Sequence, residues 1–89
     1  MSDRETRLKR LRIRSWRRGT KEMDLILGPF FDDRGDRLET TTLDLYEALL
    51  SENDQDLYQW FSEQAPAPER HRSVLSVIRS YHAGKTAKA

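Results

Sequence analysis

The chain has 89 residues, of which 36% are hydrophobic and 35% charged, and its net charge is +1. A chain this short forms one domain with a thin core and no deep substrate cavity, which argues against a free-standing enzyme. The absence of cysteine excludes disulfides, thiolate nucleophiles and zinc–thiolate sites, and no apolar run approaches the roughly 18 residues that span a bilayer, so we expect no membrane insertion.

The first predicted helix covers residues 4–18 and is basic over most of its surface. Its apolar positions recur at helical spacing: Leu8, Leu11, and Ser15 or Trp16. Gly19 is expected to end this helix, because glycine adopts the left-handed conformation at a helix C-terminus without a Cβ penalty. Arg17 and Arg18 would then lie at the negative end of the helix dipole.

A second helix is expected to follow at once. Gly19 or Thr20 would be its N-cap, and the acidic side chains of Glu22 and Asp24 suit the positive dipole end in its first turn. One apolar face is formed by five residues at helical spacing: Met23, Ile26, Leu27, Phe30 and Phe31. This face predicts that the second helix packs against the core.

Pro29 lies inside this apolar pattern and has no backbone N–H to donate. We therefore expect the second helix to kink near Leu25 or to end early. The following segment, residues 32–37 with Gly35, is predicted to be a turn.

Three further helices are predicted. One follows the threonines at 40–42, one is capped by Asp54 and closed by two prolines, and the last covers residues 69–82. Their apolar residues are Leu45, Tyr46, Leu49 and Leu50, then Leu57, Tyr58, Trp60 and Phe61, then Val74, Val77, Ile78 and Tyr81. No strand-like alternation persists, so the fold is predicted to be all-α: a compact bundle of five short helices in one domain, folded over about residues 5–82 with a loose tail at 83–89.

Catalytic and metal-binding patterns are absent from the sequence. There is no glycine-rich phosphate loop, no G-x-S-x-G and no pair of histidines at metal spacing. His71 and His82 are expected to be solvated on the surface of the last helix, and the pair Asp32-Asp33 to serve turn chemistry. We therefore expect no catalytic residue, no metal site and no enzymatic activity.

Charge is divided unevenly along the chain. Residues 4–21 hold nine basic side chains and one acidic one, a net of +8, whereas residues 22–69 hold thirteen acidic and two basic side chains, a net of −11. The basic helix could bind nucleic-acid phosphates, dock on an acidic protein surface, or be a solvated face that the rest of the molecule partly neutralises. Composition leaves all three interpretations open.

The cluster Arg18-Gly19-x-x-Glu22 lies where the first two predicted helices meet. Capping and helix dipoles would explain each residue structurally. A functional explanation is that the glycine lets another backbone approach closely, while the flanking guanidinium and carboxylate offer oriented hydrogen bonds to a partner. The pattern by itself does not decide between them.

A longer stretch around this cluster resembles the signature of the succinate dehydrogenase assembly factors, also called flavinators. The stretch is residues 15–31, SWRRGTKEMDLILGPFF, and residues 46–50 and 54–61, YEALL and DQDLYQWF, look like the second motif of that family at its usual spacing. The resemblance covers about residues 10–80. It implies a five-helix fold and a factor that binds the flavoprotein subunit of succinate dehydrogenase, and in some bacteria of fumarate reductase, and promotes covalent attachment of FAD to it.

The resemblance also implies which residues bind the partner. The R-G-x-x-E motif is the functional centre of the family, which places Arg18, Gly19 and Glu22 at the flavoprotein contact, with Arg17 and Asp24 beside them. The FAD belongs to the client, where a histidine bonds to the flavin 8α-methyl carbon, so no cofactor of its own is expected.

The resemblance leads us to expect a monomer that binds no nucleic acid. We expect it in the bacterial cytoplasm rather than in the mitochondrial matrix. A small basic helical nucleic-acid-binding protein is the alternative, because the segment 4–21 is so basic.

Overall fold

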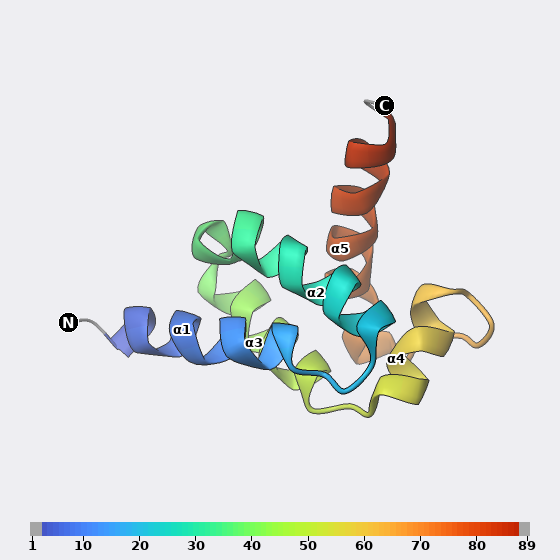
Figure 1. Ribbon diagram of the computed structural model, residues 1–89, viewed down its shortest axis with the longest axis horizontal. Helices are drawn as coiled ribbons and strands as arrows, with labels where there is room; N and C mark the ends of the chain where they lie inside the picture. Colours follow the sequence, from blue (N-terminus) through green and yellow to red (C-terminus); the bar gives the residue numbers. More distant parts are fainter. Residues whose placement is uncertain (1–2, 88–89) are drawn as a thin grey trace.

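A computed structural model describes residues 3–87, and five α-helices with one short 3-10 helix make up its elements (Figure 1). The helices are α1 (Asp3–Trp16), α2 (Lys21–Arg34), η1 (Gly35–Arg37), α3 (Thr40–Leu50), α4 (Asp54–Phe61) and α5 (Glu69–Ala87). The predicted all-α bundle of five helices is confirmed, and residues 3–87 contain no strand. None of these helices is both long enough and apolar enough to cross a membrane.

Helix α2 is the central element of the bundle. It runs antiparallel to α1, with which it forms a hairpin, and it also packs against α4 and α5. Helix α5 crosses α2 at a steep angle (Figure 1). All five α-helices contribute to one apolar core, and the fully buried side chains include Leu11, Met23, Leu27, Phe30, Phe31, Leu43, Tyr46, Leu49, Leu57, Val74 and Ile78. Most of the predicted apolar faces are therefore the ones that the bundle buries.

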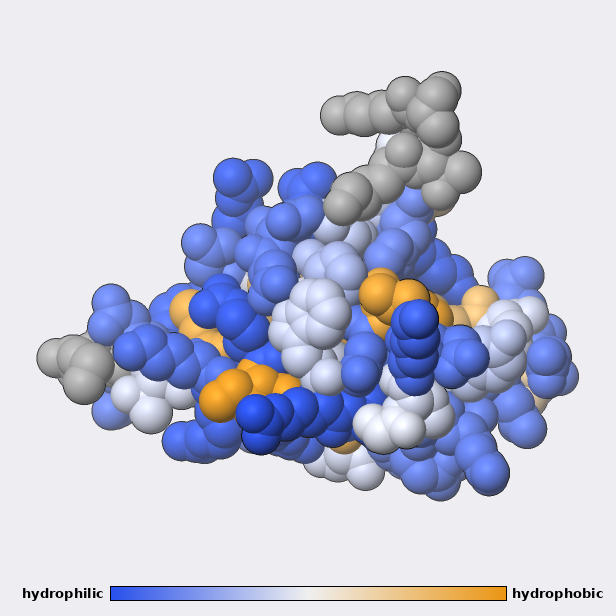
Figure 2. Space-filling model, in the orientation of Figure 1, coloured by the Kyte–Doolittle hydropathy of each residue, from blue (hydrophilic) through white to orange (hydrophobic). Residues whose placement is uncertain are grey.

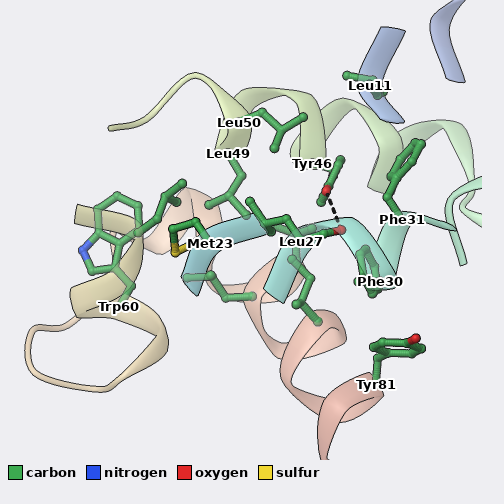
Figure 3. Packing of buried hydrophobic residues seen from close by; sticks show 14 of the residues in the cluster. Leu11, Met23, Leu27, Phe30, Phe31, Tyr46, Leu49, Leu50, Trp60 and Tyr81 are labelled. Atoms are coloured by element: carbon green, nitrogen blue, oxygen red, sulfur yellow. Dashed lines mark hydrogen bonds between the residues drawn. The ribbon is translucent and has the colours of Figure 1, made fainter. Parts of the chain in front are cut away.

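Aromatic rings fill the part of the core between α2, α3 and α5 (Figure 3). Tyr46 stacks on Phe31 with ring centroids 5.0 Å apart, and Phe30 meets Tyr81 edge to face at 5.6 Å. The Tyr46 hydroxyl is hydrogen-bonded to the Ser15 Oγ at 2.6 Å and donates to the Leu27 carbonyl at 3.5 Å. Burial raises the pKa of this hydroxyl above its usual value, so Tyr46 links α1, α2 and α3 as a neutral phenol.

Of the two outcomes predicted for the second helix, a kink near Leu25 or an early end, the early end is wrong. The helix continues through the proline to Arg34, and the predicted turn at 32–37 is reduced to the 3-10 turn Gly35–Arg37. Packing explains the difference, because Leu27 before the proline and Phe31 after it are both fully buried on the same face. Burial of that face offsets the backbone hydrogen bond that the proline cannot make.

Other helix boundaries also shifted. Helix α1 ends at Trp16, two residues before the predicted end, and Asn53 rather than Asp54 caps α4 by accepting a hydrogen bond from the Asp56 N–H at 2.8 Å. Helix α5 extends to Ala87, beyond the predicted end at His82, and the rest of the predicted tail, 88–89, lies outside the described residues. The predicted cap of α2 by Thr20 is confirmed.

The expectation that His71 is solvated is wrong. His71 is only 1% exposed, its Nε2 lies 2.7 Å from a Glu52 carboxylate oxygen, and its ring packs 5.5 Å from that of Trp60. Hydrogen bonds from His71 and Arg70 lower the pKa of Glu52. The buried face of α5 therefore begins one turn earlier than predicted. It is also rotated slightly around the helix axis relative to the prediction, because Leu75 is buried while Val77, which was predicted to be buried, is 41% exposed.

His82 is half-buried rather than solvated. Its Nε2 lies 2.7 Å from the Ile26 carbonyl oxygen of α2, and its ring meets Tyr81 edge to face. Both histidines thus connect α5 to other parts of the bundle, which the spacing of residues in the sequence does not reveal.

Replacing Tyr46 by phenylalanine tests the central hydrogen bonds. Tyr46→Phe should lower the free energy of unfolding at neutral pH by about 1 kcal/mol, because the buried hydroxyl no longer bonds to Ser15. Tyr58→Phe is the matched control, because Tyr58 is 44% exposed. Urea unfolding followed by circular dichroism measures both, and equal effects of the two changes would contradict this account.

The same pair of proteins predicts a pH dependence. Above the ordinary tyrosine pKa of 10.0 the unfolded chain loses the Tyr46 proton, whereas the folded chain keeps it because its pKa is raised. The stability due to this group is complete below the unfolded pKa and is lost as the pH rises toward the folded pKa. The difference in stability between the wild type and Tyr46→Phe should therefore shrink as the pH is raised above about 10.

Candidate functional site

The junction loop, residues 17–20, connects α1 to α2 through a sharp reversal of the chain. Gly19 has a φ of +100°, a region that L side chains rarely adopt. Thr20 is extended and accepts a hydrogen bond from the Met23 N–H at 3.4 Å, which caps α2. The Arg18 N–H donates to the Asp24 carboxylate at 2.9 Å, so Asp24 closes the loop from the first turn of α2.

Arg18 points into the protein from this loop. Its side chain is only 11% exposed, and its Nε donates to the Asp54 carboxylate at 2.9 Å. Its Nη1 and Nη2 donate to the carbonyls of Leu50 and Glu52 at 2.6 and 2.8 Å, at the C-terminal end of α3. All three guanidinium nitrogens are thus used within the chain, and the residue fixes the junction loop to the loop between α3 and α4.

Gly19, Thr20 and Glu22 are exposed beside this buried anchor. A Cβ added at Gly19 would lie 3.6 Å from the Asp54 carboxylate, an ordinary contact, so backbone conformation rather than lack of space requires glycine. The predicted site residues fall into two groups, one exposed and one that holds the loop in place. Gly19 and Glu22 are accessible, as is Arg17, whereas the side chains of Arg18 and Asp24 hold the loop in place.

A shallow depression of about 610 Å³ adjoins the exposed part of the loop. It is lined by Thr20, Glu22, Asp54, Gln55, Tyr58, Gln59 and Gln64. Carboxylate, amide and phenol groups on its walls can exchange hydrogen bonds with another protein surface. Sequence reasoning assigned Tyr58 to an apolar face and missed the three glutamines. Two of them, Gln55 and Gln59, share one side of α4 with Tyr58 at spacings of three and four.

A second feature that the sequence did not reveal joins α1 to α2. The Trp16 ring lies directly on Gly28, where an added Cβ would be only 2.4 Å from the indole carbons. Its indole N–H donates to the Asp32 carboxylate at 3.1 Å, and Arg12 pairs with the same carboxylate at 3.2 Å. Trp16 nevertheless remains 38% exposed, so this ring is held rigidly at the surface.

Comparison with known proteins identifies the relatives of the chain. The family model described as "Flavinator of succinate dehydrogenase" matches residues 9–82. The "FAD assembly factor SdhE" of Pseudomonas putida is 40% identical over 76 residues, which cover 83% of this chain and 89% of that protein. The range matched by the family model contains the residues on which the resemblance was based, and the family is confirmed.

Fungal proteins are similar too. "Succinate dehydrogenase assembly factor 2, mitochondrial" of Schizosaccharomyces pombe is 39% identical over 70 residues, 79% of this chain and 50% of that protein. The protein of the same name from Mycosarcoma maydis is 37% identical over 67 residues, 75% of this chain and 28% of that protein. The chain therefore spans half or less of the length of these two relatives. No solved structure matches the chain.

Two neighbouring arginines test the anchor in the junction loop. Arg18→Ala should lower the free energy of unfolding by about 3 kcal/mol, because it leaves the Asp54 carboxylate and two carbonyls without their donor. Arg17→Ala removes the same charge from an exposed position and should change stability by less than about 0.5 kcal/mol. Denaturant unfolding of both proteins decides, and a mild Arg18 effect would rule out the anchoring role.

A pair of glycines tests the backbone at the loop. Gly19→Ala should destabilise the fold by about 1 to 2 kcal/mol, because alanine is strained at positive φ. Gly84→Ala is the control, since that glycine is in helix α5 with open space around it, and the substitution should be neutral or slightly stabilising. Thermal unfolding distinguishes the two, and stabilisation by Gly19→Ala would contradict the assigned conformation.

Proposed function

The chain belongs to the family of flavinators of succinate dehydrogenase, and from this membership we propose that it binds the flavoprotein subunit of that enzyme and promotes covalent attachment of FAD. The flavoprotein subunit of fumarate reductase is a second client of the same kind. The observation that carries the proposal is the accessible junction loop, where Gly19 and Glu22 are exposed within the segment that the family model matches.

The covalent chemistry in this proposal belongs to the client. FAD binds to the flavoprotein, whose own histidine forms the bond, and this chain contributes neither a cofactor nor a catalytic group. Its contribution is to hold the client in a conformation that aligns the histidine with the flavin, so the gain is positional. The groups around the depression beside Glu22 are hydrogen-bonding groups, which suit such a binding role.

The two charged residues of the motif have different roles in this mechanism. Arg18 acts as a positioning residue, because its three hydrogen-bonding nitrogens fix the loop against α3 and α4. Gly19 then presents backbone without a side chain, and Glu22 presents a carboxylate at the rim of the depression. A client segment can approach the bare backbone closely and donate hydrogen bonds to Glu22.

The nucleic-acid alternative is not supported by the family match. Several cations of the basic first segment are also engaged within the protein. Arg7 pairs with Asp44 and Glu47 at 2.6 and 2.9 Å, and Arg12 pairs with Asp32. These pairs reduce the positive field that phosphate groups would meet.

The proposed working form is a monomer in the bacterial cytoplasm. A bacterial relative matches this chain at 40% identity and a mitochondrial one at 39%.

Glu22→Gln tests the proposed function. The change keeps the size and hydrogen-bonding reach of the side chain but removes its charge, so covalent flavin on the client should form about tenfold more slowly, equivalent to about 1.4 kcal/mol. The assay reconstitutes flavinylation with purified flavoprotein subunit and FAD and measures flavin fluorescence that survives denaturing electrophoresis.

Glu69→Gln is the matched control for this assay. Glu69 is also exposed and lies in the first turn of its helix, as Glu22 does, so both changes remove the same favourable interaction with a helix dipole. Flavinylation with Glu69→Gln should equal that of the wild type. A wild-type protein that fails to accelerate flavinylation would refute the function, and equal rates with the two variants would refute the role of Glu22.

A further inference from the structure

Exposed apolar side chains gather on the α1–α2 hairpin. Five large apolar side chains are exposed among the described residues, and three of them belong to this hairpin: Ile13 at 56%, Leu25 at 53% and Trp16 at 38%. Figure 2 shows hydrophobic patches over α1 and over the first half of α2, each surrounded by hydrophilic surface. We call Ile13, Trp16 and Leu25 the apolar ridge.

Helical spacing places the ridge residues on one side of the hairpin. Ile13 and Trp16 are three residues apart on α1, and Leu25 is three residues before Gly28, on which the Trp16 ring lies. Leu25 is also three residues after Glu22. The ridge therefore extends along α2 from the exposed carboxylate of the candidate site to the tryptophan.

Trp16 is already fixed in position on this surface. The ring packs against the backbone of Gly28, which has no side chain to displace it, and the hydrogen bond to Asp32 sets the orientation of the ring. Because the Trp16 ring is already immobile, little of its side-chain entropy is lost when a partner covers it. Rigid tryptophans of this kind are frequent energetic anchors of interfaces.

Unpaired cations lie beside the ridge. Arg10 and Arg17 are exposed and flank Ile13 at spacings of three and four, and neither has an ion-pair partner among residues 3–87. Arg12, on the side facing α2, is neutralised by Asp32. The chemistry that fits this surface is an apolar patch bordered by carboxylates.

We propose that the apolar ridge is a second contact surface for the flavoprotein client, separate from the junction loop and occupied by an apolar, acid-bordered patch of that subunit. The inference rests on the proposed function, because it identifies the occupant with the same client. Continuity with Glu22 along α2 supports it, since one protein surface that covers Glu22 can extend directly over Leu25 and Trp16.

Lipid and nucleic acid fit this surface less well. The core-facing side of α1, with Leu11 and Ser15, is buried in the bundle, so the helix cannot turn that side toward a bilayer. Asp32 neutralises Arg12 on this side of the hairpin, which reduces the positive field that phosphate groups would meet.

The test compares charged substitutions on and off the ridge. Ile13→Glu and Leu25→Glu change side chains that are more than half exposed, so both proteins should fold, which circular dichroism and thermal unfolding check. Each should weaken binding to purified flavoprotein subunit about tenfold, as expected when a contact in an interface core is lost. Val77→Glu is the matched control on α5, 41% exposed, and should bind within about twofold of wild type.

The outcomes separate this inference from the proposed function. If the wild type does not bind the flavoprotein subunit, the proposed function fails and the ridge proposal fails with it. If wild type and Val77→Glu bind, Glu22→Gln binds weakly, and both ridge variants bind as wild type, the ridge proposal alone is overturned. It is also overturned if the ridge variants bind the client normally but abolish self-association in sedimentation, or attachment to vesicles containing phosphatidylglycerol.

Discussion

The Arg18 guanidinium determines the geometry on which the candidate site depends. It connects a loop at one end of the α1–α2 hairpin to Asp54 and to the end of α3, more than thirty residues away in the sequence. A buried ion pair of this kind gains little over apolar packing, but it is costly to leave half-made, so it specifies one arrangement more than it stabilises the fold. With Arg18 in this position, Gly19 stays at positive φ and faces solvent.

The same anchor explains why Glu22 and α4 form one surface. Asp54 is the first residue of α4 and also lines the depression that contains Glu22 and Tyr58. The ion pair thus holds the start of α2 against the start of α4. Without it, the exposed carboxylate and the exposed side of α4 would be related only through the packing of α2 against α4 in the core. A partner therefore meets a surface that is organised before binding, which lowers the entropy cost of association.

Local patterns in the sequence predicted the helices well, because a buried face repeats every three to four residues and caps act over one turn. The Thr20 cap and the face from Met23 to Phe31 are of this kind. Local patterns do not reveal the polar groups whose partners are distant. His71 is buried because Glu52 accepts its hydrogen bond. Arg18 points into the protein because Asp54 and two backbone carbonyls accept hydrogen bonds from its guanidinium. Capping and helix patterns placed the motif at the junction of the first two helices, but the contact of the Trp16 ring with Gly28 has no signature in local spacing.

A positional mechanism needs more than one point of contact. A single contact at the junction loop would leave the client free to rotate about it, and alignment of two reacting groups requires that rotation be restricted. Glu22, Leu25 and Gly28 follow one another at intervals of three residues on α2, and the Trp16 ring rests on the last of them. Glu22 and Leu25 project from one helix that is packed into the core, and the Trp16 ring of α1 is held against the same helix at Gly28, so the three side chains form a rigid line. Contact along this line fixes an orientation as well as a position, which the proposed positional mechanism requires.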